Sequence, residues 1–242
     1  METAIEVRQV QKTFKNGVKA VQGISLSVLT GQVYGVIGPN GAGKTTLMNM
    51  ISTLLVPDSG DIRVLGESVL QNPKAIRRRI NLCSGHANFA WSLTLAENLH
   101  FYAMLYGLKG RDRRSRVHEL LSAFSLEEYA DRRFDEVSTG VKQRLALAKA
   151  LINNPEVLLL DEPTVGLDPD VSIKVREHIK DYHKATGCTL LITTHYMQEA
   201  ADLCEQVAFI RDGRVAIQGS PADLLKKFAA RDMEAVFLEL AK

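Results

Sequence analysis

Hydrophobic positions along the chain follow two periods, which predict alternating strands and helices. Short apolar or alternating runs bounded by turn residues predict strands, whereas apolar residues three and four positions apart predict helices. The predicted strands span residues 5–10, 23–28, 33–38, 62–65, 157–161, 189–194 and 207–211. The predicted helices span residues 44–54, 95–106, 117–124, 142–151, 171–184 and 197–203. Gly213 predicts a tight turn into residues 214–218, and the chain ends in an amphipathic tail.

The order of these elements predicts an α/β fold. Strands and helices that alternate after residue 157 favour a mostly parallel sheet. The first forty residues consist mainly of strands, so we expect an N-terminal antiparallel β subdomain. The signal at about residues 86–151 is helical, which predicts a helical subdomain inserted into the α/β core. We expect one main domain over residues 1–222 and a C-terminal helical tail over residues 223–242.

Composition and charge narrow the class of protein. The 242 residues are 45% hydrophobic, enough for a sizeable core, and the net charge of +2 gives no reason to expect a nucleic-acid partner. Cys83, Cys188 and Cys204 lack metal-ligand spacing and are expected to be small core residues in a reducing setting. The N-terminus has no basic region followed by an apolar stretch, so we expect no signal peptide. No apolar run approaches the roughly 18 residues that a membrane-spanning helix needs.

A phosphate-binding loop lies between the strand that ends near residue 38 and the helix that follows. The pattern G-x-x-x-x-G-K-[ST] is matched in full, with candidate nucleotide-binding residues Gly38, Pro39, Asn40, Gly41, Ala42, Gly43, Lys44, Thr45 and Thr46. Glycines let successive backbone N–H groups point at phosphate oxygens, and the helix N-terminus adds partial positive charge. Lys44 supplies a full charge and Thr45 a hydroxyl for Mg²⁺. A glycine-rich turn without a ligand is disfavoured, because strand, loop and helix all occur in the required order.

Two adjacent carboxylates end the apolar strand at residues 157–161. Asp161 is placed to hold Mg²⁺ opposite Thr45. Neighbouring strand side chains point to opposite faces, so Glu162 is free to accept a proton from a water that attacks the γ-phosphate. The alternative is that these carboxylates form an ordinary solvated acidic turn. It is disfavoured because the same chain contains a complete phosphate-loop motif. We therefore interpret the chain as an ATPase with a P-loop NTPase core that uses ATP and Mg²⁺.

At this point the residues resemble the ATP-binding cassette (ABC) family, from about residue 5 to residue 240. The segment 137–141, Val-Ser-Thr-Gly-Val, is similar to the family signature Leu-Ser-Gly-Gly-Gln, with three departures. The resemblance implies that Ser138, Thr139 and Gly140 act in trans, on the γ-phosphate held by a second subunit. Alternatively, Ser138 merely caps its own helix.

Further residues follow the order of the family's motifs. The resemblance implies that Asp168 lies in a loop at a dimer interface and that His195 contacts the γ-phosphate and orients water. Phe14 is similar to the aromatic residue that stacks on adenine, unless it is a core residue. Gly85 stands where the family carries a glutamine that touches Mg²⁺, water and the permease, and Ser84 or His86 could replace that side chain only in part.

The resemblance to export-type members, whose substrates include drugs, polysaccharides, lipids and sodium, implies an ATP-hydrolysing transporter subunit. ATP-driven closure of a dimer, expected to be a homodimer, would power export through a separate integral-membrane permease. The chain would then lie at the cytoplasmic face of the inner membrane, attached through that permease. Two alternatives remain open: a soluble ABC ATPase in a role such as cofactor assembly, and a slow regulatory nucleotide-binding module. Phe89 and Trp91 are either docking anchors or core residues, and the arginines at 77–79 and 111–116 are expected on solvated helix faces.

Overall fold

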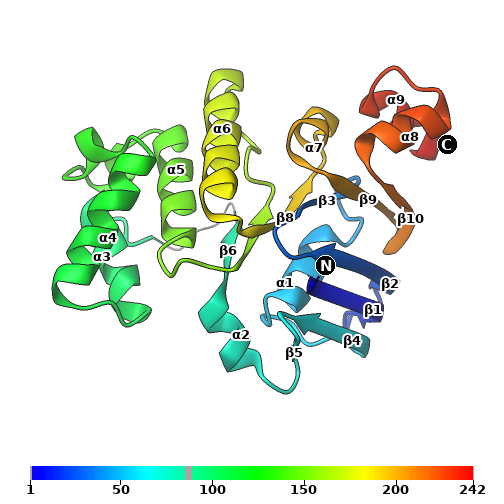
Figure 1. Cartoon of the computed structure of the whole chain (residues 1–242), viewed down its shortest axis with the longest axis horizontal. Coiled ribbons are helices and arrows are strands. Elements are labelled where there is room, and N and C mark those ends of the chain that lie inside the picture. Colours follow the sequence, from blue (N-terminus) through cyan, green and yellow to red (C-terminus); the bar gives the residue numbers. More distant parts are fainter. Residues whose placement is uncertain (1, 85–88, 242) are drawn as a thin grey trace.

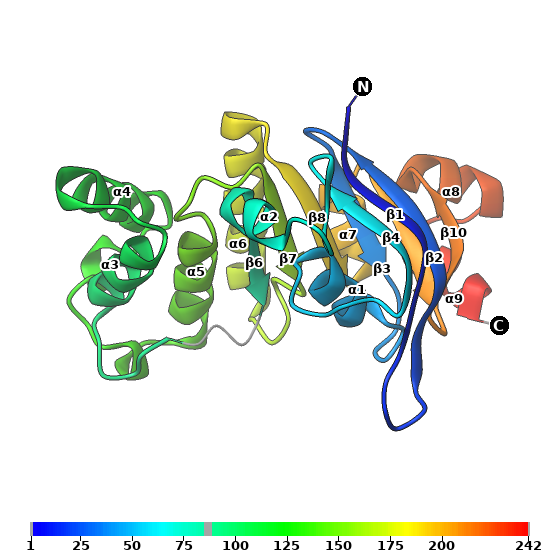
Figure 2. The same ribbon diagram turned by 90° about the horizontal axis from the view of Figure 1, so that it is seen from below.

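The computed structural model describes residues 2–84 and 89–241, and its N-terminal sheet is antiparallel. Four strands have the order β2-β1-β4-β5, and β1 pairs with both β2 and β4. Their bounds are β1 Thr3–Thr13, β2 Lys19–Leu29, β4 Ser59–Val64 and β5 Glu67–Ser68. Figure 2 shows the β1–β2 loop reaching away from the rest of the chain. The predicted antiparallel β subdomain is therefore present, with longer strands than the sequence pattern indicated.

The second sheet carries the edge at which the candidate residues meet. Its order is β10-β9-β3-β8-β7-β6, with β9, β3, β8, β7 and β6 parallel and β10 antiparallel to β9. The bounds are β3 Val33–Ile37, β6 Ile80–Ser84, β7 Val157–Asp161, β8 Thr189–Thr194, β9 Gln206–Arg211 and β10 Arg214–Gly219. Parallel strands in register end at one edge, where Ile37 lies beside Thr194, and Asp161 beside Thr193 and Ser84.

Two apolar cores cover the two faces of this sheet. Successive strand side chains point to opposite faces, so each buried strand contributes to both cores. On β7, Leu158 and Leu160 pack into the core shared with the helices on one side, whereas Val157 and Leu159 pack into the core shared with α1 and the antiparallel sheet. This two-sided burial explains why β7 reads as a continuous apolar run.

The helices occupy both faces and the two ends of the molecule. Their bounds are α1 Lys44–Ile51, α2 Pro73–Arg79, α3 Leu95–Leu105, α4 Gly110–Ala123, α5 Thr139–Ala150, α6 Pro169–Thr186, α7 Met197–Leu203, α8 Pro221–Phe228 and α9 Met233–Ala241. Figure 1 shows α3, α4 and α5 gathered at one end, and α8 and α9 at the other. This arrangement confirms the predicted fold class, while the exact domain boundaries remain predictions.

Local signals explain several of the observed boundaries. Thr94 and Glu97 form a reciprocal capping box that starts α3. The predicted helix at 44–54 ends at Ile51 instead, and Thr53 beyond it adopts a left-handed conformation with φ 65°. The sequence reasoning missed strand β6, and it expected the arginines at 77–79 on a helix face without giving bounds for α2. Strand β6 has only five residues and gains its place by pairing with β7, a partner 77 positions away in register.

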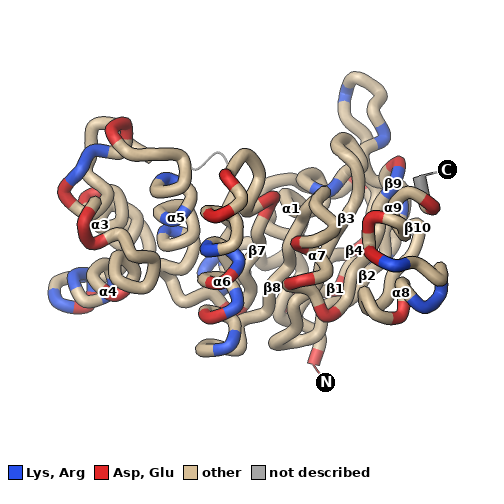
Figure 3. Tube along the Cα trace, turned by 90° about the horizontal axis from the view of Figure 1, so that it is seen from above, with Lys and Arg blue, Asp and Glu red and all other residues tan. Residues whose placement is uncertain are grey.

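Burial and charge agree with the composition. Cys83, Cys188 and Cys204 are buried free thiols, as expected, and burial raises the pKa of Cys83 and of Cys188 to about 12. Within residues 2–84 and 89–241, no helix combines the length and the apolar character needed to cross a membrane. Figure 3 shows Lys and Arg positions on α4 and α5, and both signs of charge along α6.

Candidate functional site

The phosphate loop follows β3 and is shaped by close backbone approaches. A Cβ atom on Gly38 would lie 2.1 Å from the carbonyl oxygen of Ile210, and one on Gly43 would lie 2.2 Å from that of Ala20. Gly43 also has a φ of 102° immediately before α1. Only glycine fits at these two positions, so the loop passes tightly between β9 and β2. Pro39, Asn40 and Gly41 are exposed at its tip, whereas Ala42 is buried and Thr46 partly buried.

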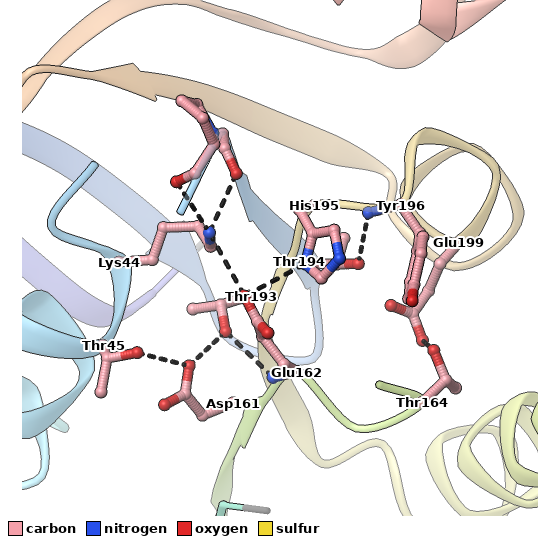
Figure 4. Close-up of polar contacts among 12 residues, drawn as sticks. Lys44, Thr45, Asp161, Glu162, Thr164, Thr193, Thr194, His195, Tyr196 and Glu199 are labelled. Atoms are coloured by element: carbon pink, nitrogen blue, oxygen red, sulfur yellow. Dashed lines mark hydrogen bonds and ion pairs between the residues drawn. The ribbon is translucent and has the colours of Figure 1, made fainter. Parts of the chain in front are cut away.

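Lys44 is 4% exposed, and its ammonium group is held by oxygen atoms. Its Nζ atom donates to the carbonyl oxygens of Gly38 at 2.9 Å and Pro39 at 3.1 Å. The same atom lies 3.3 Å from Oε1 of Glu162, across the edge of the sheet (Figure 4). A buried cation is costly unless it is paired, and these three contacts supply its partners.

Asp161 and Thr45 place two hard oxygen donors next to each other. The Thr45 hydroxyl donates to Oδ1 of Asp161 at 3.3 Å, and the buried Thr193 hydroxyl donates to the same atom. Carboxylate and hydroxyl oxygens suit Mg²⁺, which is commonly held by one or two carboxylates together with substrate phosphates. Among the described residues no group of three or more His, Cys, Asp or Glu could hold a metal ion. The donors therefore fit a magnesium ion that also takes oxygens from a nucleotide.

Glu162 has the most constrained backbone of the site. Its φ is 53°, a left-handed conformation that costs a non-glycine residue roughly 1–3 kcal/mol. The Glu162 N–H donates to the carbonyl oxygen of Thr193 at 3.0 Å and to its hydroxyl oxygen at 3.1 Å. This turn aims the carboxylate at His195, whose Nδ1 lies 3.3 Å from Oε1. The two residues predicted to be catalytic are thus in contact.

The signature residues lie at the start of α5. Ser138 and Thr139 are exposed, and the Ser138 hydroxyl accepts a hydrogen bond from the backbone N–H of Val141 at 3.4 Å. A Cβ atom on Gly140 would lie 2.9 Å from Val171 of α6, so close helix packing also favours glycine there. Ser138 therefore does cap its own helix, and its action on a second subunit stays a prediction.

A cavity of about 570 Å³ connects several of these elements. It is lined by Thr45, Asn49, Ser84, Thr139, Gln143, Asp161, Glu162, Val165 and Leu167. Thr139 of the signature thus faces the same space as the carboxylates of its own chain. Ser84, considered as a partial replacement for the family's glutamine, is on this wall, whereas Gly85 and His86 lie outside the described residues.

The peripheral candidates are placed as follows. Phe14 is 39% exposed in the β1–β2 loop and belongs to neither core, so the alternative that it is a core residue is wrong. Asp168 is exposed at the N-terminus of α6. Phe89 is buried in the core around α3, while Trp91 is 71% exposed.

Sequence reasoning missed three polar residues that hold the site together. Gln143 donates from Nε2 to the carbonyl oxygen of Pro163 at 2.7 Å, and the Thr164 hydroxyl donates to Oε1 of Glu199 at 2.8 Å. Gln143 and Glu199 each lie 20 or more positions from their partners, so no local pattern reveals the pairs. The one available signal was the position of Glu199, four residues after His195.

Comparisons with known proteins agree with this geometry. Residues 21–165 match the family described as "ABC transporter", a range that includes the phosphate loop, the Ser138 turn and the acidic pair. The chain is 38% identical over 237 residues to the Nod factor export ATP-binding protein I of Paraburkholderia xenovorans (strain LB400), covering 98% of this chain and 77% of that protein. It is 41% identical over 240 residues to the daunorubicin resistance ATP-binding protein DrrA3 of Streptomyces coeruleorubidus, covering 99% and 75% of the two chains.

Solved structures give the same result. The structure described as the ATP-binding subunit of an ABC transporter superposes with a TM-score of 0.87 at 29% identity, over 99% of this chain and 100% of the other. The dimeric post-hydrolysis state of the cassette MJ0796, bound to ADP and Pi, gives a TM-score of 0.82 at 28% identity, over 89% and 98%. The chain therefore belongs to the ABC transporter family, as one of its ATP-binding subunits.

Proposed function

We propose that this ATPase powers export through a separate membrane permease by closing and reopening a dimer around ATP and Mg²⁺. The observation that carries the proposal is the convergence of Lys44, Asp161, Glu162 and His195 at one edge of the parallel sheet. Open α/β sheets bind ligands outside the carboxyl ends of their strands, which is this edge.

The contacts of Lys44 suggest how the site receives nucleotide. The Lys44 ammonium group contacts two loop carbonyls and Glu162. Phosphate oxygens offer stronger, charge-assisted partners, so ATP draws Lys44 away from Glu162. Glu162 then keeps its contact with His195 and is free to accept a proton from water.

Thr45 and Asp161 are the residues that would hold magnesium. The ion supplies positive charge that stabilises the negative charge on the phosphates. Thr193 fixes Asp161 from the other side, because its hydroxyl donates to the carboxylate while its oxygen accepts from the Glu162 N–H. The carboxylate that binds metal and the carboxylate that accepts the proton are therefore oriented by one buried threonine.

A second copy of the chain is proposed to complete the site. Ser138 and Thr139 are exposed at the N-terminus of α5, an orientation suited to a phosphate on another molecule. Asp168 is exposed at the N-terminus of α6, the helix whose Val171 lies close to Gly140. The dimeric MJ0796 structure provides a precedent for such pairing among similar chains. A homodimer needs only this one sequence and makes two equivalent sites.

The permease is proposed to dock on the groove between the β6 side of the core and α3. A cavity of about 510 Å³ lies there, and its wall includes the exposed Leu54 together with Tyr102, Tyr106 and Lys149. The described lining residues include no carboxylate, while Lys149 and Arg77 contribute positive charge. Apolar residues exposed near a basic groove suit a cytoplasmic segment that carries acidic and apolar side chains.

The direction of transport and the location rest on the relatives. Both the Nod factor protein and the daunorubicin resistance protein are named for export or drug resistance. We therefore propose export, with the subunit on the cytoplasmic face of the inner membrane through its permease. The regulatory-module alternative is disfavoured because Glu162 and His195 already contact each other.

Replacement of Glu162 by Gln tests the core of the proposal. The amide cannot accept the proton, so we expect kcat for ATP to fall about 100-fold or more, with ATP affinity retained. Trapped ATP should make E162Q elute as a dimer in the presence of Mg²⁺, while the protein without nucleotide does not. Normal turnover of E162Q would remove Glu162 as the base, and the absence of any ATP-dependent dimer would refute the mechanism.

A matched pair of exposed leucines tests the docking groove. Leu54 lines the groove and is 66% exposed, whereas Leu238 on α9 is 64% exposed. We expect Leu54→Glu to abolish co-purification of a polytopic protein from detergent-solubilised membranes, and Leu238→Glu to preserve it. Equal recovery with both variants would place the permease elsewhere, and a purely soluble set of partners would favour the non-transport alternative.

A further inference from the structure

Glu199 is a buried carboxylate that the mechanism above does not use. It is 1% exposed in the first turn of α7, and burial raises its pKa. An acidic residue at this third helical position usually reaches back to the backbone N–H of the N-cap residue. Here the Thr194 hydroxyl already accepts from the N–H of the N-cap residue, Tyr196, at 2.9 Å. Glu199 is therefore free to point inward.

The partners of Glu199 belong to two catalytic segments. Its Oε1 accepts from the Thr164 hydroxyl at 2.8 Å, and Thr164 is two residues after Glu162. The Thr194 hydroxyl lowers the pKa of Glu199 against the effect of burial, and Thr194 immediately precedes His195. Figure 4 shows the Glu199 side chain directed at Thr164, away from the Lys44 side of the site. The carboxylate thus joins the segment that carries Glu162 to the segment that carries His195.

The turn at Glu162 needs such a support. Its left-handed backbone persists only where surrounding contacts hold it. Thr193 holds the N–H of Glu162, and Gln143 holds the carbonyl oxygen of Pro163. Glu199 accepts a hydrogen bond from the next residue, Thr164, and so holds the chain where it leaves the turn. Loss of that third contact lets the turn relax and lengthens the 3.3 Å approach of Glu162 to His195.

We propose that Glu199, held in the helix that follows His195, is a positioning residue for ATP hydrolysis, which acts through its bond to Thr164 to set the distance between Glu162 and His195. The inference rests on the proposed roles of Glu162 and His195. Because Glu199 acts on the placement of Glu162 and His195, its loss should lower turnover more than ATP affinity. The phosphates of ATP are expected to bind at the Lys44 loop, which Glu199 does not contact. Atom Oε2 of Glu199 has no hydrogen-bond partner among the described residues, so Oε1 is the atom whose bond matters.

Steady-state ATPase assays of the full chain with ATP and Mg²⁺ test this role. We expect Glu199→Ala to lower kcat about tenfold or more, with KM changed less than about threefold, because a bond to a charged group is lost. Thr164→Val should reproduce much of the loss. Glu199→Gln keeps an oxygen at the Oε1 position, and Thr164→Ser keeps the hydroxyl, so both should stay within about threefold of the wild type.

Two further measurements separate positioning from general destabilisation. Leu203→Ala loosens the same helix without touching the contact, so it should lower Tm but retain kcat below the melting range. The double variant E199A/T164V should be no slower than the slower single variant, because both remove one bond. Additive losses, an equal kcat loss in L203A, or normal kcat in E199A would each overturn the proposal.

Hydrogen exchange provides a readout that does not depend on turnover. The amides of Glu162, Thr164 and Val165 should exchange faster in E199A and T164V than in L203A and the wild type, with or without nucleotide. Unchanged exchange in this segment would overturn the positioning role. A wild-type protein without ATPase activity, but with this exchange pattern, would refute the proposed function and leave the role of Glu199 in place.

Discussion

The phosphate-loop edge and the Ser138 turn differ in how their polar groups are satisfied. At the edge, Lys44, Asp161 and Glu162 are joined by ion pairs and hydrogen bonds within the chain. At the turn, Ser138 and Thr139 are exposed, and the Ser138 hydroxyl accepts a hydrogen bond from its own helix. The difference teaches that one half of the site is organised by contacts within the chain, whereas the other half leaves its polar groups exposed.

Replacement of Lys44 by Ala should have the largest effect on the organised half. The variant loses charge-assisted bonds to phosphate oxygens, so we expect ATP affinity to fall roughly 100-fold. Equilibrium binding of a fluorescent ATP analogue, with Ser138→Ala as the control, measures the change. Because Ser138 belongs to the other half of the site, S138A should bind ATP with nearly the affinity of the wild type. An equal loss of ATP affinity in K44A and S138A would contradict the distinction between the two halves.

Mixing two inactive variants tests whether the exposed half acts in trans. In a mixed dimer of K44A and S138A, one site has both an intact phosphate loop and an intact signature turn. Random pairing in a symmetric dimer then restores about a quarter of wild-type ATPase activity, although each variant alone is nearly inactive. A mixture no more active than its components would show that Ser138 serves the site of its own chain.

Phe14→Ala should lower ATP affinity less than Lys44→Ala does, because it removes only the contact with the adenine base. Stacking of an aromatic side chain on a base contributes about 1–3 kcal/mol, so we expect ATP affinity to fall about tenfold while inorganic triphosphate binds as before. Val18→Ala in the same loop is the control, since Val18 is also exposed. An equal loss of triphosphate binding would indicate a disturbed loop rather than a stacking contact.

The pH dependence of stability should change least. Burial raises the pKa of Glu199 above its ordinary 4.5, although the hydroxyls of Thr194 and Thr164, and more weakly Arg176 and His195, oppose the shift. The protonated form is favoured in the folded state, so its stabilising contribution is complete below pH 4.5 and is lost as pH rises through the folded pKa. Denaturant unfolding should show Glu199→Gln gaining stability relative to the wild type over that window. A constant difference across pH would contradict a raised pKa.

Local sequence was sufficient to predict the elements that are marked by an uninterrupted apolar run or by a complete motif. The apolar runs of β3 and β7 and the motif at residues 38–45 predict strand, loop and helix, and the structure has them at the sheet edge. Strand β6 escaped prediction, because its short segment depends on a partner strand far along the chain. The contacts of Gln143 and Glu199 escaped for the same reason, since each joins segments that only the folded sheet brings together.

The sequence by itself determined the family, the phosphate loop and the identity of the acidic pair, because these depend on residue types at fixed local spacing. The tertiary structure decided the left-handed turn at Glu162, its contact with His195 and the exposure of the Ser138 turn. Those features follow from the packing of parallel strands side by side, which places chain segments 30 or more residues apart within hydrogen-bonding distance. No local pattern contains that information.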